Sequence, residues 1–163
     1  MRHGIRFCLL FLFVASTHVQ AELLRVRSDP VFAALVSSVN AELDFAWQEQ
    51  RTWSLGLYYS DGWPFFNDSV RVFSPAFRVD FYRDGPLTNG WHPNVMVQAD
   101  IVTRDTGELT VSGRIKARQS YQWVWDPVSL SVGLGAQTGV GEFYREITCV
   151  ICPTYEFSLG WQL

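Results

Sequence analysis

Nine charged residues of this 163-residue sequence share the polar positions of segments in which apolar and polar residues alternate. Side chains two residues apart in an extended chain point the same way, so each segment gathers its charges on one face. Basic groups and carboxylates that share a face out of water must pair with one another, because a lone buried charge is costly. The candidate charge network consists of Glu42, Asp44, Arg78, Asp80, Asp100, Arg114, Lys116, Arg118 and Glu156.

Two cysteines near the C-terminus, Cys149 and Cys152, are separated by two residues. In an exported chain the oxidising periplasm makes a disulfide within a loop the expected state of this pair. A zinc ribbon would need a second pair, and a thioredoxin-type site would need a different fold around the motif. A metal or redox role and free thiols are the remaining alternatives.

His92 is the only histidine after residue 21 and stands beside Pro93 at an expected turn, residues 83–92. A general base needs a nucleophile within hydrogen-bond reach, and no carboxylate is placed in the sequence to orient this imidazole. The chain also holds no G-x-S-x-G segment, metal-ligand cluster or phosphate-binding loop. We therefore expect a turn or interface histidine, and no catalytic residue, cofactor or metal.

The elements that must position these residues are strands, because the alternation has a period of two. In residues 155–163 every odd position is apolar or aromatic and every even position is polar or glycine. Related alternation predicts strands over residues 35–47, 53–60, 73–81, 94–101, 109–125, 128–137 and 154–163. Residues 23–28 are a shorter candidate strand, and Asp29 and Pro30 could equally start a short helix that runs to Val36.

Residues 1–21 have the features of a cleaved signal peptide, with an early basic stretch, an apolar core at residues 7–15 and a small residue at Ala21. Residues 22–163 then form one domain with 11 basic and 16 acidic residues, a net charge of −5, and no basic patch for nucleic acid. No later run is long enough for a transmembrane helix, although the chain is 48% hydrophobic and contains 7 tryptophans.

A chain that ends on a strand must hide the free edge of that strand, and closing a barrel does so. The pattern predicts an all-β fold, an eight-stranded antiparallel up-and-down barrel in the cell outer membrane. Its apolar face would meet lipid and its charges would face the lumen. Because eight strands enclose a space barely wide enough for their own side chains, we expect the charge network to plug the lumen.

Six of the seven tryptophans fall at one end of this expected barrel, the periplasmic end if the last strand finishes there. The turns on that side would be residues 48–52, 83–92 and 126–127, and the outer loops residues 61–72, 105–108 and 138–153. Indole rings favour the headgroup boundary. The predicted periplasmic aromatic girdle consists of Trp47, Trp53, Trp91, Trp123, Trp125 and Trp161. Trp63 lies in an apolar outer loop that rests on the outer leaflet or marks a contact site.

Several segments resemble small uncharacterised outer-membrane β-barrel proteins of proteobacteria. The resemblance is carried by Gln50-Arg51-Thr52-Trp53-Ser54-Leu55-Gly56, by Arg78-Val79-Asp80-Phe81-Tyr82 with Gly90-Trp91, and by Tyr121-Gln122-Trp123-Val124-Trp125 with residues 130–135. It covers most of the chain after residue 21 and implies an eight-stranded barrel with no assigned activity. The C-terminus also resembles the signal read by the barrel-assembly machinery, with Leu163 where Phe or Trp is usual.

These observations predict a monomeric, non-enzymatic outer-membrane barrel with a structural or loop-mediated interaction role. Its expected partners are outer-membrane lipid and the barrel-assembly machinery, with no nucleic acid. One alternative is a barrel-wall enzyme acting on lipid A or phospholipid, which would need a His and Ser pair facing the leaflet. Another is a secreted, lipocalin-like barrel that binds an apolar ligand, with apolar residues lining the interior and charges facing water.

Overall fold

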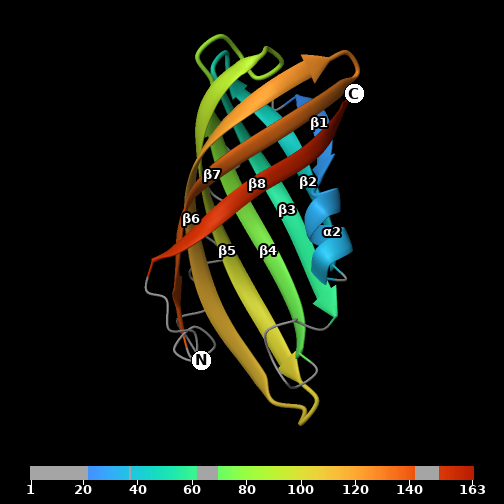
Figure 1. Ribbon diagram of the computed structural model, residues 1–163, viewed down its shortest axis with the longest axis vertical. Helices are drawn as coiled ribbons and strands as arrows, with labels where there is room; N and C mark the ends of the chain where they lie inside the picture. The colour runs from blue at the N-terminus through green and yellow to red at the C-terminus, as the bar shows by residue number, and fades with distance from the viewer. Residues whose placement is uncertain (1–21, 37, 62–69, 142–150) are drawn as a thin grey trace.

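The computed structural model describes residues 22–36, 38–61, 70–141 and 151–163, so the predicted signal peptide, Trp63 and Cys149 lie outside the described residues. The described residues form a closed barrel of eight antiparallel strands, paired in the order in which they occur along the chain (Figure 1). The strands are β1 (Leu23–Ser28), β2 (Ser38–Gln48), β3 (Arg51–Asp61), β4 (Val70–Phe81), β5 (Gly90–Arg104), β6 (Leu109–Trp125), β7 (Val128–Val140) and β8 (Cys152–Gln162). The predicted fold class is therefore confirmed.

The last strand closes the barrel against the first. Arg25 of β1 pairs with Gln162 of β8, and this pairing runs to Ser28 and Leu159. Beyond the strand, the amide nitrogen of Leu163 donates to the carbonyl oxygen of Leu24 at 3.1 Å. Pairing with β1 and β7 hides the edge of the terminal strand, which would otherwise present unpaired N–H and C=O groups.

The alternating sequence sorts side chains onto the two faces of the barrel wall. Along β2 the buried residues Asn40, Glu42 and Asp44 point into the barrel, and Val39 and Leu43 between them are exposed on the outside. The same alternation of buried and exposed residues runs along most of the other strands. The barrel thus has a polar interior and an apolar exterior, the reverse of an ordinary soluble protein.

Glycines on the inner side of β7 make room for long side chains of β6. A Cβ atom added to Gly135 would lie 2.0 Å from the carbonyl oxygen of Ala117 and 2.7 Å from Cγ of Arg118. At Gly133 the added atom would lie 2.1 Å from Oγ of Ser120. No side chain fits at these distances. Glycine at positions 133 and 135 therefore allows β7 to pack closely against Ser120 and Arg118 of β6.

Several strands extend into segments that the sequence predicted to be loops or turns, and β4 and β7 are two examples. β4 begins at Val70, inside the predicted loop 61–72, and β7 continues to Val140, inside the predicted loop 138–153. Both extensions pair with long neighbours, since β5 has 15 residues and β6 has 17. Cross-strand pairing outweighs the turn-forming composition of these segments. Composition alone therefore predicts a start of β4 that is too late and an end of β7 that is too early.

Both structures considered for the N-terminal segment occur, because β1 is followed directly by the helix α2 (Pro30–Val36). The amide of Ala33 donates to the carbonyl oxygen of Asp29 at 3.1 Å, and the proline sits in the first turn, where its missing N–H costs nothing. Oδ1 of Asn40 accepts from the amide of Asp29 at 2.6 Å and ties this corner to β2. Among the described residues, no helix has the length and hydropathy to cross a bilayer.

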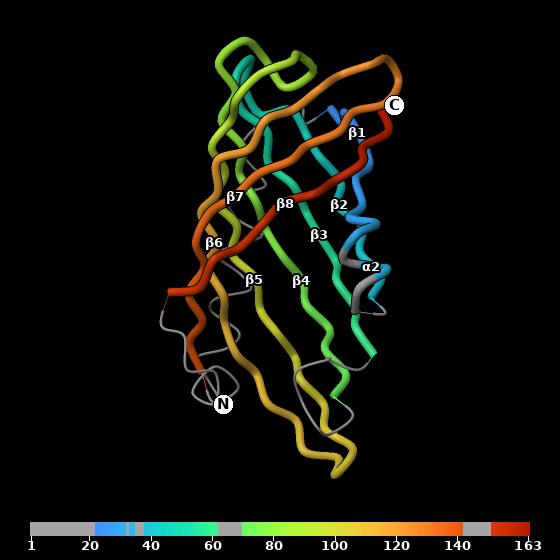
Figure 2. Tube along the Cα trace, viewed as in Figure 1, coloured from blue at the N-terminus to red at the C-terminus, as the bar shows by residue number. Residues whose placement is uncertain are grey.

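The helix lies beside β2, where the continuation of a longer first strand would run (Figures 1 and 2). β1 has 6 residues whereas β8 has 11, and their pairing stops at Ser28 and Leu159. The part of β8 before Leu159 therefore faces the α2 region instead of a paired strand. This break in the wall positions the site described next.

Candidate functional site

Two arginines of β1 organise the ion pairs in the barrel interior. Arg25 and Arg27 are 0% and 1% exposed, and both bind Asp44 of β2. Nη2 of Arg27 lies 2.7 Å from Oδ1 of Asp44 and 3.4 Å from Oδ2 of Asp80 on β4. Nη2 of Arg25 donates to the hydroxyl of Tyr82 at 2.6 Å. The short first strand is thus bound through its side chains to strands across the lumen.

Arg78 of β4 connects these residues to the far side of the barrel. Its Nε donates to Oδ2 of Asp80 at 2.9 Å. Its Nη1 lies 3.2 Å from Oε1 of Glu156 on β8 and 3.3 Å from Oε2 of Glu42 on β2. Each of these carboxylates faces at least one guanidinium, which offsets the cost of removing the charges from water.

Sequence reasoning missed the two residues at the centre of this network, Arg25 and Arg27. The alternation in residues 23–28 predicts a short strand with these arginines at its polar positions, but the predicted charge network does not include them. The signal was present, because Leu24 and Val26 alternate with the two arginines in the same way as in the longer strands. A six-residue segment is too short for its periodicity to separate a strand from an irregular segment.

A second group of ion pairs surrounds Asp100 of β5. Nη2 of Arg114 lies 2.8 Å from Oδ1 of Asp100, which also accepts from Oγ of Ser74 at 2.6 Å and from Nε2 of Gln98 at 2.9 Å. On the same face of β6, Nε of Arg118 donates to Oδ1 of Asn94 at 3.0 Å. The structure therefore places eight of the nine predicted network residues in the buried interior.

The ninth, Lys116, stands between Arg114 and Arg118 on β6 and is only partly buried. Its Nζ lies 5.7 Å from the centre of the Tyr58 ring, a cation–π contact, and no ion pair of this lysine is found in the part of the chain that the structure describes. The hydroxyl of Tyr58 in turn donates to Glu42. Among the described residues, buried arginines and carboxylates balance: Arg25, Arg27, Arg78, Arg114 and Arg118 against Glu42, Asp44, Asp80, Asp100 and Glu156.

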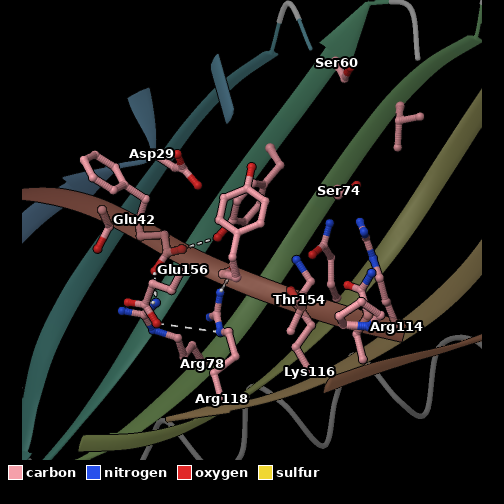
Figure 3. A pocket seen from close by; sticks show the side chains of 18 of the residues that line it. Asp29, Glu42, Ser60, Ser74, Arg78, Arg114, Lys116, Arg118, Thr154 and Glu156 are labelled. Carbon is pink, nitrogen blue, oxygen red and sulfur yellow. Dashed lines mark hydrogen bonds and ion pairs between the residues drawn. The ribbon is translucent and has the colours of Figure 1, made fainter. Parts of the chain in front are cut away.

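A cavity of about 470 Å³ lies next to Lys116 (Figure 3). In Figure 3 the carboxylates of Asp29, Glu42 and Glu156 are on one side, and Lys116 and Arg114 are on the other. The lumen is filled around Arg25 and Arg27 but open here, so the predicted plug occupies only part of the interior.

The cavity is also lined by residues of the outer barrel face, among them Tyr59 of β3 and Tyr155 and Phe157 of β8. Tyr59 and Tyr155 are exposed, with 42% and 41% of their surfaces accessible. Residues from both faces of a wall can line one cavity only where the wall is interrupted. The cavity therefore reaches the outer surface at the part of β8 that is not paired with β1.

His92 lies inside the barrel and not in a turn, so that interpretation was wrong. β5 begins at Gly90, and His92 pairs with Ser120 of β6, which gives the imidazole an inward position with 0% exposure. Its ring stacks on Tyr82 with 4.7 Å between ring centres, and Nε2 lies 3.5 Å from Oδ1 of Asp80. Among the described residues, no group of three or more His, Cys, Asp or Glu side chains is placed to hold a metal ion.

The predicted girdle residues all lie toward the end of the barrel that carries the C-terminus (Figure 1). Trp91, Trp125 and Trp161 are 63%, 57% and 56% exposed on the outside, and Trp53 stacks between the rings of Phe45 and Phe77. Cys152 is disulfide-bonded, and its predicted partner Cys149 lies outside the described residues, so that pairing stays a prediction.

No protein-family model, curated protein or solved structure matches this chain. The function therefore has to be inferred from the geometry of the barrel.

Proposed function

We propose that this protein is a small outer-membrane β-barrel, exported by a cleaved signal peptide, that crosses the bilayer with its eight strands. The distribution of polarity across the wall carries this proposal. Charged side chains are buried in the interior, and large apolar residues such as Leu134 and Val39, 74% and 71% exposed, cover the outside. Soluble monomers rarely expose continuous apolar surface of this extent, whereas lipid contact removes its cost.

Strand length and aromatic residues support the same proposal. A tilted strand crosses a bilayer core with about 9–11 residues, and β2, β3 and β8 each have 11. The exposed tryptophans near the C-terminal end match the interfacial aromatic belt of membrane barrels. That end would face the periplasm, with outer-membrane lipid around the wall and the barrel-assembly machinery as the partner during insertion.

We further propose a monomeric, non-enzymatic protein that contributes to the envelope or presents its outer loops to a partner. The charged groups of the interior support this role, because most of them are already engaged in ion pairs with one another. A barrel-wall hydrolase would need a histidine and a serine facing the leaflet. His92 instead faces the lumen beside Asp80. A lipocalin-like barrel would need apolar residues inside, and the structure has the opposite arrangement.

The direct test is the electrophoretic mobility of detergent-extracted protein, unheated and boiled, together with cell fractionation. A closed membrane barrel resists SDS in the cold and runs faster than its boiled form. We expect such a shift and recovery in the outer-membrane fraction. A single mobility together with soluble protein in the periplasm would overturn the proposal.

A further inference from the structure

We propose that the cavity beside Lys116 binds a single-chain amphiphile with one negative charge, of the fatty-acid type, with its carboxylate against Lys116 and its chain against the aromatic residues of the wall opening. This inference rests on the proposed membrane location, because the chain would reach the cavity from the lipid side.

The position of Lys116 in the cavity indicates an anion. The buried arginines and carboxylates of the described residues are equal in number. Partly buried Lys116 adds one positive charge and partly buried Asp29, on the other side of the cavity, adds one negative charge, but no ion pair joins Lys116 to a carboxylate among the described residues. The contact of Lys116 with the Tyr58 ring, at 5.7 Å, offers only partial compensation. One carboxylate beside Lys116 would supply the ion-pair partner that this lysine lacks among the described residues, whereas a phosphate monoester would bring close to two negative charges.

Unused hydrogen-bond donors indicate the same ligand class. Nη2 of Arg118 and Nη2 of Arg78 are buried with no hydrogen-bond partner in the described part of the chain, and both arginines line the cavity. Their side chains are held by Asn94 and Asp80, so these donors are fixed in place. A guanidinium has no acceptor atoms, so only an acceptor such as a carboxylate oxygen can satisfy these groups.

The opposite wall of the cavity makes the site directional. Glu42 and Glu156 lie on the far side from Lys116 in Figure 3, and both already pair with guanidinium groups, Glu42 with Arg27 and Arg78 at 3.3 Å. An anionic head would avoid these carboxylates and settle toward Lys116 and Arg118 of β6, away from Arg78, whose Nη1 lies 3.2 Å from Glu156 and 3.3 Å from Glu42. The acids therefore define one position for the charge within the cavity.

The apolar part of the ligand follows from the break in the barrel wall. The cavity lining includes Tyr59, Tyr155 and Phe157, which belong to the lipid-facing side of β3 and β8. Because pairing of β1 with β8 stops at Leu159, the chain would lie along this part of β8 without displacing a strand, next to helix α2, which contacts both β2 and β8. The volume of about 470 Å³ is within the range of small-molecule sites, roughly 300–1,000 Å³.

The experiment measures equilibrium binding of radiolabelled dodecanoate to the barrel in phosphatidylcholine nanodiscs, with empty nanodiscs subtracted. Only preparations that show the cold-to-boiled mobility shift are used, so failure of the barrel and failure of binding are separate results. We expect saturable binding near one dodecanoate per barrel. Competition by dodecanol, butyrate or dodecyl phosphate should be weaker than by unlabelled dodecanoate. Dodecanol competing equally would show a purely apolar site, and butyrate or dodecyl phosphate competing equally would refute the proposed ligand class.

Five variants, two of them controls outside the cavity, locate the ligand. Lys116→Met removes the positive charge without breaking an ion pair and should weaken dodecanoate binding roughly tenfold to hundredfold. Lys116→Arg keeps the charge and should bind dodecanoate as the wild type does. The control Arg83→Gln, in an exposed turn, should leave binding unchanged. Phe157→Ala should weaken binding several-fold, and Phe73→Ala, an exposed residue of β4 outside the cavity, should not. Equal binding by wild type and Lys116→Met would overturn the proposal.

Discussion

Nη2 of Arg27 lies 2.7 Å from Oδ1 of Asp44, and the two side chains are 1% and 0% exposed. This ion pair joins the shortest strand of the barrel to its neighbour β2, at the place where β1 also pairs with the terminal strand. Because β1 has only 6 residues, side-chain contacts across the lumen contribute a large share of what holds it in the wall.

Replacing Arg27 with Gln should therefore destabilise the barrel strongly. The change leaves Asp44, Asp80 and Glu42 without one of their cations, and breaking a buried pair costs about 3–5 kcal/mol. Urea unfolding of the protein in lipid vesicles, followed by tryptophan fluorescence, measures the loss. Arg83→Gln, the same change in an exposed turn, should stay within about 0.5 kcal/mol of wild type. Equal stability of the two variants would contradict a structural role for the network.

Arg114→Ala should lower the free energy of unfolding by about 3 kcal/mol, the lower end for a buried pair, because Asp100 keeps its bonds from Ser74 and Gln98. Adding Asp100→Asn removes the uncompensated charge and should recover part of the loss. The double-mutant cycle compares the thermal unfolding of the four proteins, followed on gels as the loss of the fast-migrating folded form with increasing temperature. Additive losses in the double variant would show that the two groups do not interact.

Gly135→Ala should prevent formation of the compact barrel, because the new Cβ would lie 2.0 Å from the carbonyl oxygen of Ala117 and 2.6 Å from Cα of Arg118. The matched control is Gly113→Ala, whose Cβ would meet only Cγ2 of Val140 at 3.2 Å. The fraction of refolded protein that migrates in the fast form reports the difference. Refolding of Gly135→Ala to the same extent as the control would contradict the close approach of β6 and β7 at this position.

Leu134→Arg tests directly whether the apolar face meets lipid. Leu134 is 74% exposed in the middle of β7, so an arginine there would cost about 2–4 kcal/mol at the bilayer midplane. Leu109→Arg, at the first residue of β6 and 63% exposed, should cost only about 0–1 kcal/mol near the interface. Unfolding in vesicles gives both values. In a water-soluble barrel both substitutions would be nearly neutral.

The predicted bond between Cys149 and Cys152 can be tested by thiol labelling. Unreduced wild-type protein should take up no maleimide on either residue, because the structure has Cys152 in a disulfide. Cys149→Ser and Cys152→Ser should each free one thiol, seen as one added maleimide by intact-mass measurement. Continued protection of Cys152 in the Cys149→Ser variant would show a different partner.

The sequence by itself determined the architecture, because a period of two is readable wherever one face of a strand is apolar and the other polar. Residues 155–163 show this most clearly, and β8 ends the barrel as they predict. The alternation also placed eight of the nine candidate network residues on the buried face, and the ninth, Lys116, is partly buried, because odd and even positions of a strand face opposite ways. Local composition was a weaker guide, as Val70 and His92 show, because pairing with a long neighbour extends a strand into a segment of turn residues.

Only the tertiary structure decided which charges meet. Arg25, Arg27 and Asp44 come together because β1 closes against β2 and β8, and no spacing along the chain expresses that contact. The structure also decided that α2 follows the short β1 where a longer first strand would continue, which leaves β8 before Leu159 unpaired with β1 and leaves the cavity at Lys116. The odd or even position of a residue in its strand decides which face of the wall its side chain takes. Closure of the barrel and the lengths of the strands decide which partners that side chain meets in the lumen.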